Sequence, residues 1–190
     1  MLRKSKGGII MAKKVLIIST SIRNNSNSEK LAQAFAEGAK AAGNEVELVS
    51  LKDKTIAFCR GCLACQKIGH CVIKDDANAI TDKILEAEVV AWATPVYYYE
   101  MSGQMKTMID RANSLYPKDY KFRDVYLLTA AAEDEPDVDE RVETGLKGWI
   151  ACFEKARFAG KICAAGVGAP GEIQGNAKLQ EAFDMGKAIV

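Results

Sequence analysis

The chain has 190 residues, of which 48% are hydrophobic, and its 26 basic side chains nearly balance its 25 acidic ones. A chain of this length can bury about 70% of its unfolded surface in one core, without help from disulfides. The charge balance goes against a nucleic-acid-binding surface and a polybasic membrane anchor, and no apolar run approaches the roughly 20 residues that span a bilayer. We therefore expect one cytoplasmic domain whose partners are small molecules or proteins, with no nucleic acid and no membrane among them.

The chain begins with a short basic segment. Its apolar stretch covers only residues 9–12 before Lys13 and Lys14 follow, which is too short for a signal peptide. We expect a flexible N-terminal extension over residues 1–13, with Met11 as an alternative start, and a single domain over residues 14–190.

Five apolar or alternating segments have the character of strands, and segments with helical spacing of apolar residues connect them. Strands that alternate with helices require right-handed crossovers and a parallel sheet covered on both faces, so the predicted class is α/β and doubly wound. Pro95 is expected to end the third strand. In chain order the predicted elements are a strand at 15–19, a helix at 26–42, a strand at 45–51, a helix from 76 or 78 to 85, a strand at 89–94, a helix at 103–112, a strand at 125–129, an acidic loop at 133–139, a helix at 140–158, a strand at 162–167 and a helix at 176–189.

The loop after the first strand, residues 19–28, is rich in short hydroxyl and amide side chains and leads directly into a helix. A helix N-terminus offers unpaired backbone N–H groups, and hydroxyls together with Arg23 add donors that suit a phosphate monoester. An ordinary helix-capping loop would have a similar composition. Because ligands of doubly wound sheets bind beyond the carboxyl ends of the strands, we expect the loops after Ser19, Thr94 and Thr129 to share one site.

Residues 166–171 match the pattern G-x-G-x-x-G and follow a predicted strand. A dinucleotide-binding fingerprint also needs a helix that opens at the glycines and an acidic residue on a further strand. Neither is predicted here, so we interpret the segment as a loop whose glycines allow a turn or a close approach of backbone.

Four of the six cysteines, Cys59, Cys62, Cys65 and Cys71, follow the pattern C-x2-C-x2-C-x5-C. In a chain without a secretory signal, thiols at this density indicate metal or redox chemistry. A structural zinc usually takes two C-x2-C pairs with a longer spacer, whereas successive short gaps suit the separate corners of a cuboidal iron–sulfur cluster. A cluster, a zinc ion and a group of thiols without metal all remain open.

Together these segments resemble the flavodoxin-like NAD(P)H-dependent FMN reductases, and within them the iron-sulfur flavoproteins, over nearly all of residues 14–190. The loop at residues 20–28 stands where that family carries Gly-Ser-Pro-Arg and Ser-Asn-Thr, although Thr20 and Ile22 replace the glycine and the proline. Residues 95–97 with 102–111 match its second flavin loop and the helix behind it. The cysteine motif, continued by Asp75 and Asp76, matches its compact cysteine motif.

The resemblance implies a five-stranded parallel sheet of order 2-1-3-4-5 with a cysteine-rich insertion at residues 57–75, and it implies FMN as the cofactor. It assigns the FMN phosphate to Ser19, Ser21, Arg23, Ser26, Asn27 and Ser28. It assigns the isoalloxazine ring to Pro95, Val96, Tyr97 and Tyr98, and its polar edge to the backbone of Thr129, Ala130 and Ala131. Packing at a strand end or a dimer contact would equally explain any one tyrosine of residues 97–99, and we expect that the three cannot all face the same way.

The predicted function is that of an FMN-dependent oxidoreductase, with no catalytic acid–base residue. Electrons would come from NAD(P)H or a ferredoxin-like carrier and leave to a quinone or another acceptor, with a 4Fe-4S cluster on Cys59, Cys62, Cys65 and Cys71 exchanging single electrons. The alternatives are a non-catalytic electron carrier and a flavin reductase, zinc-stabilised or metal-free, with structural cysteines. The family commonly places its flavin at a subunit interface, so the resemblance also implies a homodimer or tetramer.

Overall fold

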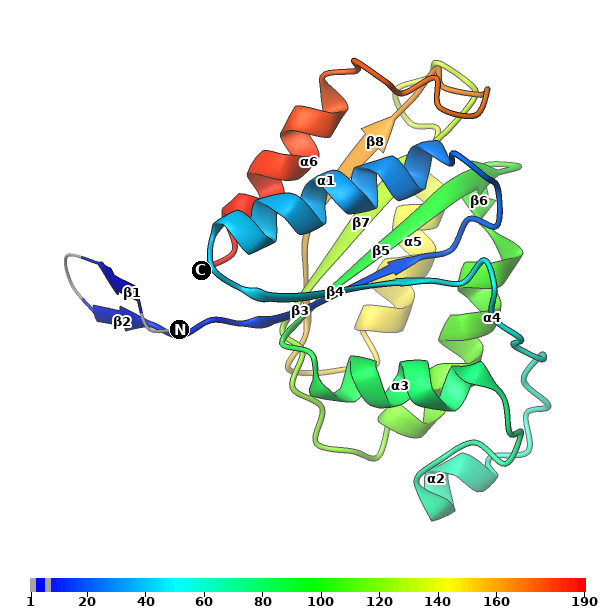
Figure 1. Ribbon diagram of the computed structural model, residues 1–190. Helices are drawn as coiled ribbons and strands as arrows, with labels where there is room; N and C mark the ends of the chain where they lie inside the picture. The colour runs from blue at the N-terminus through cyan, green and yellow to red at the C-terminus, as the bar shows by residue number, and fades with distance from the viewer. Residues whose placement is uncertain (1–2, 6–7) are drawn as a thin grey trace.

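A computed structural model describes residues 3–5 and 8–190 and contains a central parallel sheet (Figure 1). The strand order is β4-β3-β5-β7-β8, which is 2-1-3-4-5 when the parallel strands are numbered along the chain. The predicted class and strand order are therefore confirmed. The five parallel strands are β3 (Lys14–Ser19), β4 (Glu45–Ser50), β5 (Val89–Tyr97), β7 (Asp124–Ala130) and β8 (Arg157–Ala164).

Helices cover both faces of this sheet (Figure 1). The alternation of side chains along a strand explains why β3 is apolar throughout. Val15 and Ile17 enter the core beneath α1 and α6, whereas Leu16 and Ile18 enter the core on the opposite face. The first face carries α1 (Asn27–Ala41) and α6 (Lys178–Lys187), and the second carries α3 (Asp76–Glu86), α4 (Gly103–Arg111) and α5 (Glu140–Ile150).

Several short elements were not predicted. They are α2 (Ala64–Ile68), the 3₁₀ helix η1 (Ala112–Leu115) and β6 (Glu100–Met101), which pairs antiparallel with the end of β5. In the predicted extension, β1 (Arg3–Ser5) and β2 (Gly8–Ile10) form a separate antiparallel pair. Residues 1–2 and 6–7 lie outside the described part, and the flexibility of residues 1–13 stays a prediction. Among the described residues, no helix combines the length and apolar character that a bilayer crossing requires.

The third parallel strand is longer than predicted, because Pro95 does not end it. Strand β5 continues to Tyr97, and Pro95 pairs in register with Ala130 of β7. On the other side of β5, the pairing with β3 ends before Pro95, since the last pair is Ser19 with Ala93. Proline is tolerated where no strand needs its missing N–H group, so this position behaves as an edge.

The helix predicted at residues 140–158 is shorter and the following strand begins earlier. Helix α5 ends at Ile150, and β8 starts at Arg157 instead of residue 162. The chain turns because the Phe153 N–H donates to the Ile150 carbonyl (2.8 Å), while the Phe153 ring packs against Trp149 and Phe122 with centroids 5.0 and 5.1 Å away. Aromatic packing over the core has overridden local helix propensity at this point.

Candidate functional site

A small hollow lies beyond the carboxyl ends of β3, β5 and β7. Its volume is about 130 Å³, and it receives residues from the loops after β3, β5, β7 and β8. Five of the six predicted phosphate ligands line it, together with three predicted ring contacts and Ala130. The lining residues are Ser21, Arg23, Ser26, Asn27, Ser28, Pro95, Val96, Tyr97, Ala130, Ala132, Val167 and Gly168.

Hydroxyl groups at the start of α1 form one wall of this hollow, which we call the phosphate hollow. Ser26 is the N-cap, since its Oγ accepts a hydrogen bond from the Glu29 N–H (3.4 Å), and it lies 3.1 Å from the Ser28 Oγ. The Ser21 Oγ accepts from the Arg23 N–H (3.3 Å) and keeps its own proton for a ligand. Hydroxyl donors at a helix N-terminus suit a phosphate group, so the predicted ligand fits these residues.

The first two residues of the loop serve another purpose. Ser19 is fully buried, does not line the hollow, and its hydroxyl has no hydrogen-bond partner among the described residues. The Thr20 hydroxyl donates to the Ala93 carbonyl (3.0 Å) and lies 3.0 Å from the Ser102 Oγ at the N-cap of α4. The threonine that replaces the family's glycine thus connects β3 to β5 and α4, and the assignment of Ser19 to the phosphate is not supported by this geometry.

Asn27 and the loop after β8 close the other side of the hollow. The Asn27 amide donates to the carbonyls of Val167 and Ala169 (2.9 Å each) and accepts from the Ile173 N–H (3.3 Å). The Asn27 side chain therefore anchors this loop, and only its backbone is available to a phosphate. Residues 166–171 form a loop as expected. A Cβ atom on Gly171 would come within 2.1 Å of the Asn25 side chain, which shows why the approach needs a glycine.

A larger cleft continues from the phosphate hollow and shares Val96, Tyr97 and Ala132 with it. Its volume of about 530 Å³ falls in the range of small-molecule sites. We call it the tyrosine cleft, and its lining residues are Val96, Tyr97, Tyr98, Tyr99, Ala131, Ala132, Glu133 and Val138.

Three consecutive tyrosines border the tyrosine cleft, and their exposed fractions differ, at 43% for Tyr97 and 40% for Tyr99. The expectation that they cannot all face one way stays a prediction. Tyr98 and Tyr99 form the two-residue turn between β5 and β6. Their φ angles of 51° and 65° are left-handed, a conformation that hairpin turns usually give to Asn-Gly. Tyr98 at the tip is 97% exposed. Strained backbone in bulky residues beside a cleft points to a functional role for them.

The acidic loop predicted at residues 133–139 is held against this hairpin. The Tyr99 hydroxyl donates to Glu135 Oε2 (3.3 Å), and the negative charge of Glu135, followed by burial, raises the pKa of Tyr99. At its ends, the Glu133 carbonyl accepts from the Gly166 N–H (3.1 Å), and Val138 is buried. The loop is therefore an ordered wall of the tyrosine cleft.

Thr129 lines neither the phosphate hollow nor the tyrosine cleft, and the contact of its backbone with the flavin edge stays a prediction. Its hydroxyl donates to Asp139 Oδ2 (2.9 Å), and Asp139 is fully buried and paired with Lys161 (2.8 Å). Ala130 lines the phosphate hollow and Ala131 lines the tyrosine cleft, as predicted. The side chain of Thr129 therefore anchors the start of α5, and the next two residues carry the predicted contact surface.

The four clustered cysteines meet at a second site beside α4, which we call the cysteine hollow. They line one cavity of about 30 Å³ together with Arg111 and Asn113, and none of them forms a disulfide. Two N–H groups point at sulfur: the Gly61 N–H at Cys59 Sγ (3.4 Å) and the Asn113 side-chain amide at Cys65 Sγ (3.3 Å). Within residues 3–5 and 8–190, no three metal-binding side chains converge tightly enough for a single ion.

This donor set suits an iron–sulfur cluster. A cubane holds each thiolate on a different iron corner, so the sulfurs need not converge on one point, and N–H groups commonly donate to them. The cavity is small, and the segment Phe58 to Leu63 carries two of the four cysteines. Both of its end residues are exposed, at 80% and 56%.

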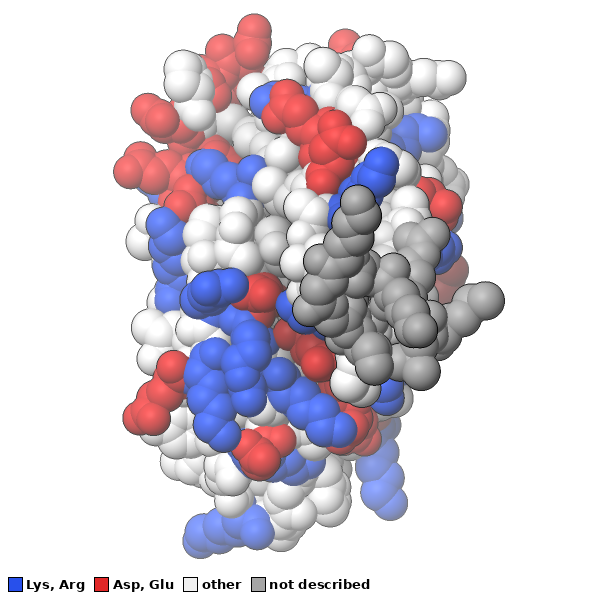
Figure 2. All heavy atoms as spheres, turned by 90° about the vertical axis from the view of Figure 1, so that its left-hand side faces the viewer, with Lys and Arg blue, Asp and Glu red and all other residues white. Residues whose placement is uncertain are grey.

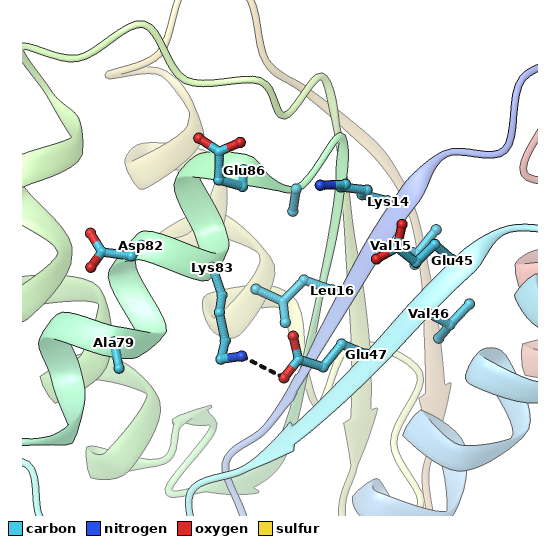
Figure 3. Close-up of a pocket in the computed structure, with 11 residues that line it drawn as sticks. Lys14, Val15, Leu16, Glu45, Val46, Glu47, Ala79, Asp82, Lys83 and Glu86 are labelled. Carbon is cyan, nitrogen blue, oxygen red and sulfur yellow. Dashed lines mark hydrogen bonds and ion pairs between the residues drawn. The ribbon is translucent and has the colours of Figure 1, made fainter.

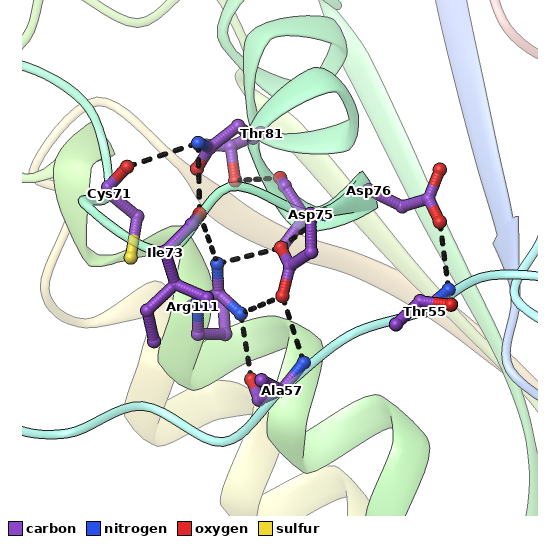
Figure 4. A network of polar contacts seen from close by, with 10 residues as sticks. Thr55, Ala57, Cys71, Ile73, Asp75, Asp76, Thr81 and Arg111 are labelled. Carbon is purple, nitrogen blue, oxygen red and sulfur yellow. Dashed lines mark hydrogen bonds and ion pairs between the residues drawn. The ribbon is translucent and has the colours of Figure 1, made fainter.

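Arg111 and Asp75 hold the cysteine insertion to the domain (Figure 4). Arg111 Nη1 and Nη2 donate to the Asp75 carboxylate (2.6 and 2.8 Å) and to the carbonyls of Ala57 (2.7 Å) and Ile73 (3.1 Å). Sequence reasoning assigned no role to Arg111. The sequence offered one signal for such a role. Arg111 lies at the end of the predicted helix, in the segment 102–111 that resembles the helix behind the family's second flavin loop.

Two further hollows lie at the amino ends of the strands, away from all predicted site residues. One, of about 520 Å³, lies between α3 and the starts of β3 and β4, where Lys83 pairs with Glu47 at 2.7 Å (Figure 3). The face in Figure 2 shows basic residues interspersed with acidic ones. The second hollow is lined by Asp124, which pairs with Arg157 (2.6 Å), and by Glu86, which pairs with Lys121.

The sequence model of the family described as NADPH-dependent FMN reductase matches residues 13–136, which include the loop at residues 19–28 and the lining of the tyrosine cleft except Val138. The chain belongs to this family. Among curated relatives, an iron-sulfur flavoprotein from Archaeoglobus fulgidus is 37% identical over 110 residues, 58% of this chain and 54% of the relative. One from Methanocaldococcus jannaschii is 36% identical over 102 residues, 54% of this chain and 53% of the relative.

The chain spans about half the length of these curated relatives. A solved structure described as an NAD(P)H:quinone oxidoreductase from Methanothermobacter marburgensis superposes with a TM-score of 0.71 at 17% identity, covering 95% of this chain and 100% of that one. At this identity the likeness shows the fold alone. The predicted resemblance to the FMN reductase family and its iron-sulfur flavoprotein branch is supported by these findings.

Proposed function

We propose that this FMN reductase family member is an oxidoreductase that binds FMN and transfers electrons from NAD(P)H, or from a reduced carrier protein, to a quinone or another acceptor. One observation carries the proposal. The phosphate hollow at the N-terminus of α1 opens directly into the tyrosine cleft, at the carboxyl edge of a flavodoxin-like sheet. The family match supports the same cofactor.

The chain's own residues would bind and orient the cofactor. Ser21, Ser26 and Ser28 supply hydroxyl donors to the phosphate, and Arg23 supplies charge while donating to the Gly168 carbonyl (2.7 Å). The apolar lining of the tyrosine cleft would exclude water, and the backbone of Ala130 and Ala131 would meet the polar edge of the ring. When bound, FMN accepts electrons as a pair and can release them singly or in pairs, which is chemistry the side chains lack.

We further propose that Cys59, Cys62, Cys65 and Cys71 hold a 4Fe-4S cluster. Their shared cavity, the two N–H groups aimed at sulfur, and the similarity to proteins named iron-sulfur flavoproteins support this assignment. We also propose a homodimer or tetramer, because the exposed Tyr98 at the border of the tyrosine cleft offers a contact that a second copy could cover.

Phosphate recognition is tested by comparing FMN with riboflavin, which lacks the phosphate. Arg23→Gln removes one charge from the phosphate hollow and should weaken FMN binding by roughly tenfold, the loss of one charge-assisted contact of about 1.4 kcal/mol. Riboflavin binding should stay unchanged, because Arg23 would face only the phosphate. Lys40→Gln, at the opposite end of α1, is the matched control. Equal effects on both ligands, or tight riboflavin binding with no preference for FMN, would contradict the site.

Catalysis is tested by anaerobic NAD(P)H oxidation with a quinone acceptor. Steady-state turnover by the purified FMN-loaded protein supports the enzyme. Absence of turnover without a partner reductase would favour the electron carrier. Iron and acid-labile sulfide assays on anaerobically purified protein test the cluster separately, since a flavin spectrum without iron would leave the flavin assignment intact.

A further inference from the structure

Arg111 is a buried cation with one N–H group left unused. Its side chain is 0% exposed, and Nη1 and Nη2 are engaged by Asp75, Ala57 and Ile73. The remaining donor, Nε, is buried and has no hydrogen-bond partner in the part of the chain that the structure describes. Burying a donor without an acceptor destabilises the folded state, so its presence calls for an acceptor that the described side chains do not supply.

The surroundings of Arg111 show where an acceptor would lie. Arg111 lines the cysteine hollow with all four clustered cysteines. The guanidinium therefore lies between its carboxylate partner, Asp75, and the cysteine hollow.

Asn113 supplies a second donor from the same direction. It follows Arg111 by two residues in η1, is partly buried, and its Nδ2 donates to Cys65 Sγ at 3.3 Å. At the junction of α4 and η1, Asn113 thus donates to Cys65, and Arg111 keeps an unpartnered Nε at the same hollow. Neither residue has a side chain that would itself ligate iron.

We propose that Arg111 and Asn113 are positioning residues of the cysteine hollow, whose N–H groups hydrogen-bond to sulfur and raise the reduction potential of a bound iron–sulfur cluster. The inference rests on the proposed function. Adding one electron makes the cluster more negative, and N–H donors stabilise the more negative state better, so the one-electron potential rises.

The competing explanation is that both residues only fasten the loop. Asn78 separates the two explanations, because its amide donates to the carbonyls of Cys71 (3.0 Å) and Ile73 (3.2 Å) and touches no sulfur. A purely structural role should make Asn113 and Asn78 variants behave alike. A role toward the cluster should affect the potential in the Asn113 variant alone.

The experiment is an anaerobic redox titration of the iron-loaded full chain, followed by EPR, with iron, sulfide and FMN content measured beside it. Asn113→Leu keeps the size and removes the donor, so the potential should fall while iron content stays near the wild-type level. Asn78→Leu should leave the potential unchanged. Arg111→Lys should retain iron in part with a lowered potential, and Arg111→Gln should lose iron.

Two results would overturn the inference in distinguishable ways. An iron-loaded Asn113→Leu protein with the wild-type potential overturns the role of the donors and leaves the proposed function intact. A wild-type protein that takes up no iron under anaerobic reconstitution overturns the cluster itself, and the inference with it.

Discussion

Asp75 illustrates how much one side chain determines in this protein. Its carboxylate caps α3 through the Ala77 N–H (3.1 Å), accepts from the Ala57 N–H (2.9 Å), and pairs with both Nη atoms of Arg111. Burial acts to raise the pKa of Asp75, but the hydrogen bonds from Arg111, Ala57 and Ala77 outweigh burial, and the net pKa is lowered. A carboxylate with a lowered pKa stabilises the folded state above the ordinary carboxyl pKa.

The first prediction concerns acid stability. The wild-type contribution from Asp75 should be complete above about pH 5, decline below the ordinary pKa of about 3.9, and vanish below the lowered folded-state pKa. Asp75→Asn should cost about 3–5 kcal/mol at pH 7, because Arg111 loses its buried partner, and should flatten the pH dependence. Urea unfolding from pH 7 to pH 2.5 measures both. Asp82→Asn, an exposed change on the same helix, serves as the control, and parallel curves for Asp75→Asn and wild type would contradict the assignment.

At the scale of elements, α1 and α6 approach each other so closely that their backbones touch. A Cβ atom on Gly38 would lie 1.9 Å from the Phe183 carbonyl oxygen, and one on Gly186 would lie 2.1 Å from the Phe35 carbonyl oxygen. Neither glycine was singled out in the sequence, because helix propensity alone disfavours glycine at such positions. The crossing of the two helices requires them.

The second prediction follows from this crossing. Gly38→Ala and Gly186→Ala should each destabilise the protein by about 1–3 kcal/mol, since the helices must separate, even though alanine favours the helix. Gly148→Ala in α5 is the matched control, because nothing lies within 4 Å of its Cβ position. That change should stabilise by about 0.5–1 kcal/mol. Thermal unfolding of the three variants provides the comparison, and stabilisation by all three would show that the helices adjust freely.

The third prediction concerns the hairpin between β5 and β6. Replacing Tyr98 and Tyr99 by Asn and Gly should stabilise the fold by about 1–2 kcal/mol, because the left-handed turn would no longer hold bulky residues. FMN affinity should decrease at the same time, since two side chains of the tyrosine cleft are lost. Urea unfolding and FMN titration measure the two effects. Unchanged FMN affinity in the stabilised variant would remove the functional explanation of the strain.

At the scale of the whole molecule, α4 lies between the two proposed redox sites. Its N-cap Ser102 contacts Thr20 and Thr94 beside the flavin loops, and its last residue Arg111 lines the cysteine hollow. Nine helical residues span about 14 Å, so the sites are neighbours with separate walls. The residues that line the cysteine hollow are absent from the linings of the phosphate hollow and the tyrosine cleft.

The fourth prediction is that the two sites bind independently. Serine at all four positions of the cysteine motif should abolish iron binding, while FMN affinity stays within about threefold of wild type, a change of less than 1 kcal/mol. Iron analysis and FMN fluorescence quenching test this on one preparation. The converse variant, Arg23→Gln, should bind iron normally. Loss of FMN binding in the serine variant would show that the cysteine insertion supports the flavin loops.

Local signals predicted most of the architecture. Buried strands of continuous apolar character, helical periodicity and N-caps identified the five parallel strands and their helices, because both periodicities are properties of neighbouring residues. The end of the third parallel strand and the end of α5 were predicted wrongly. The strand end depends on where β3 stops, and the helix end depends on packing against aromatic rings from distant segments. The turn at Tyr98 and Tyr99 escaped detection because its residues contradict the usual turn chemistry.

The amino-acid sequence by itself determined the doubly wound class, the hydroxyl-rich character of residues 19–28, and the cysteine motif, since spacing along the chain carries each of these. Only the tertiary structure decided which of those residues line a cavity. It leaves Ser19 outside the phosphate hollow and the tyrosine cleft, bonds the Thr129 and Asn27 side chains to protein groups, and places Arg111 among the cysteines. The reason is physical: a hydroxyl or amide at a loop bonds to whichever polar group the fold brings nearest, and that group belongs to a distant segment of the chain.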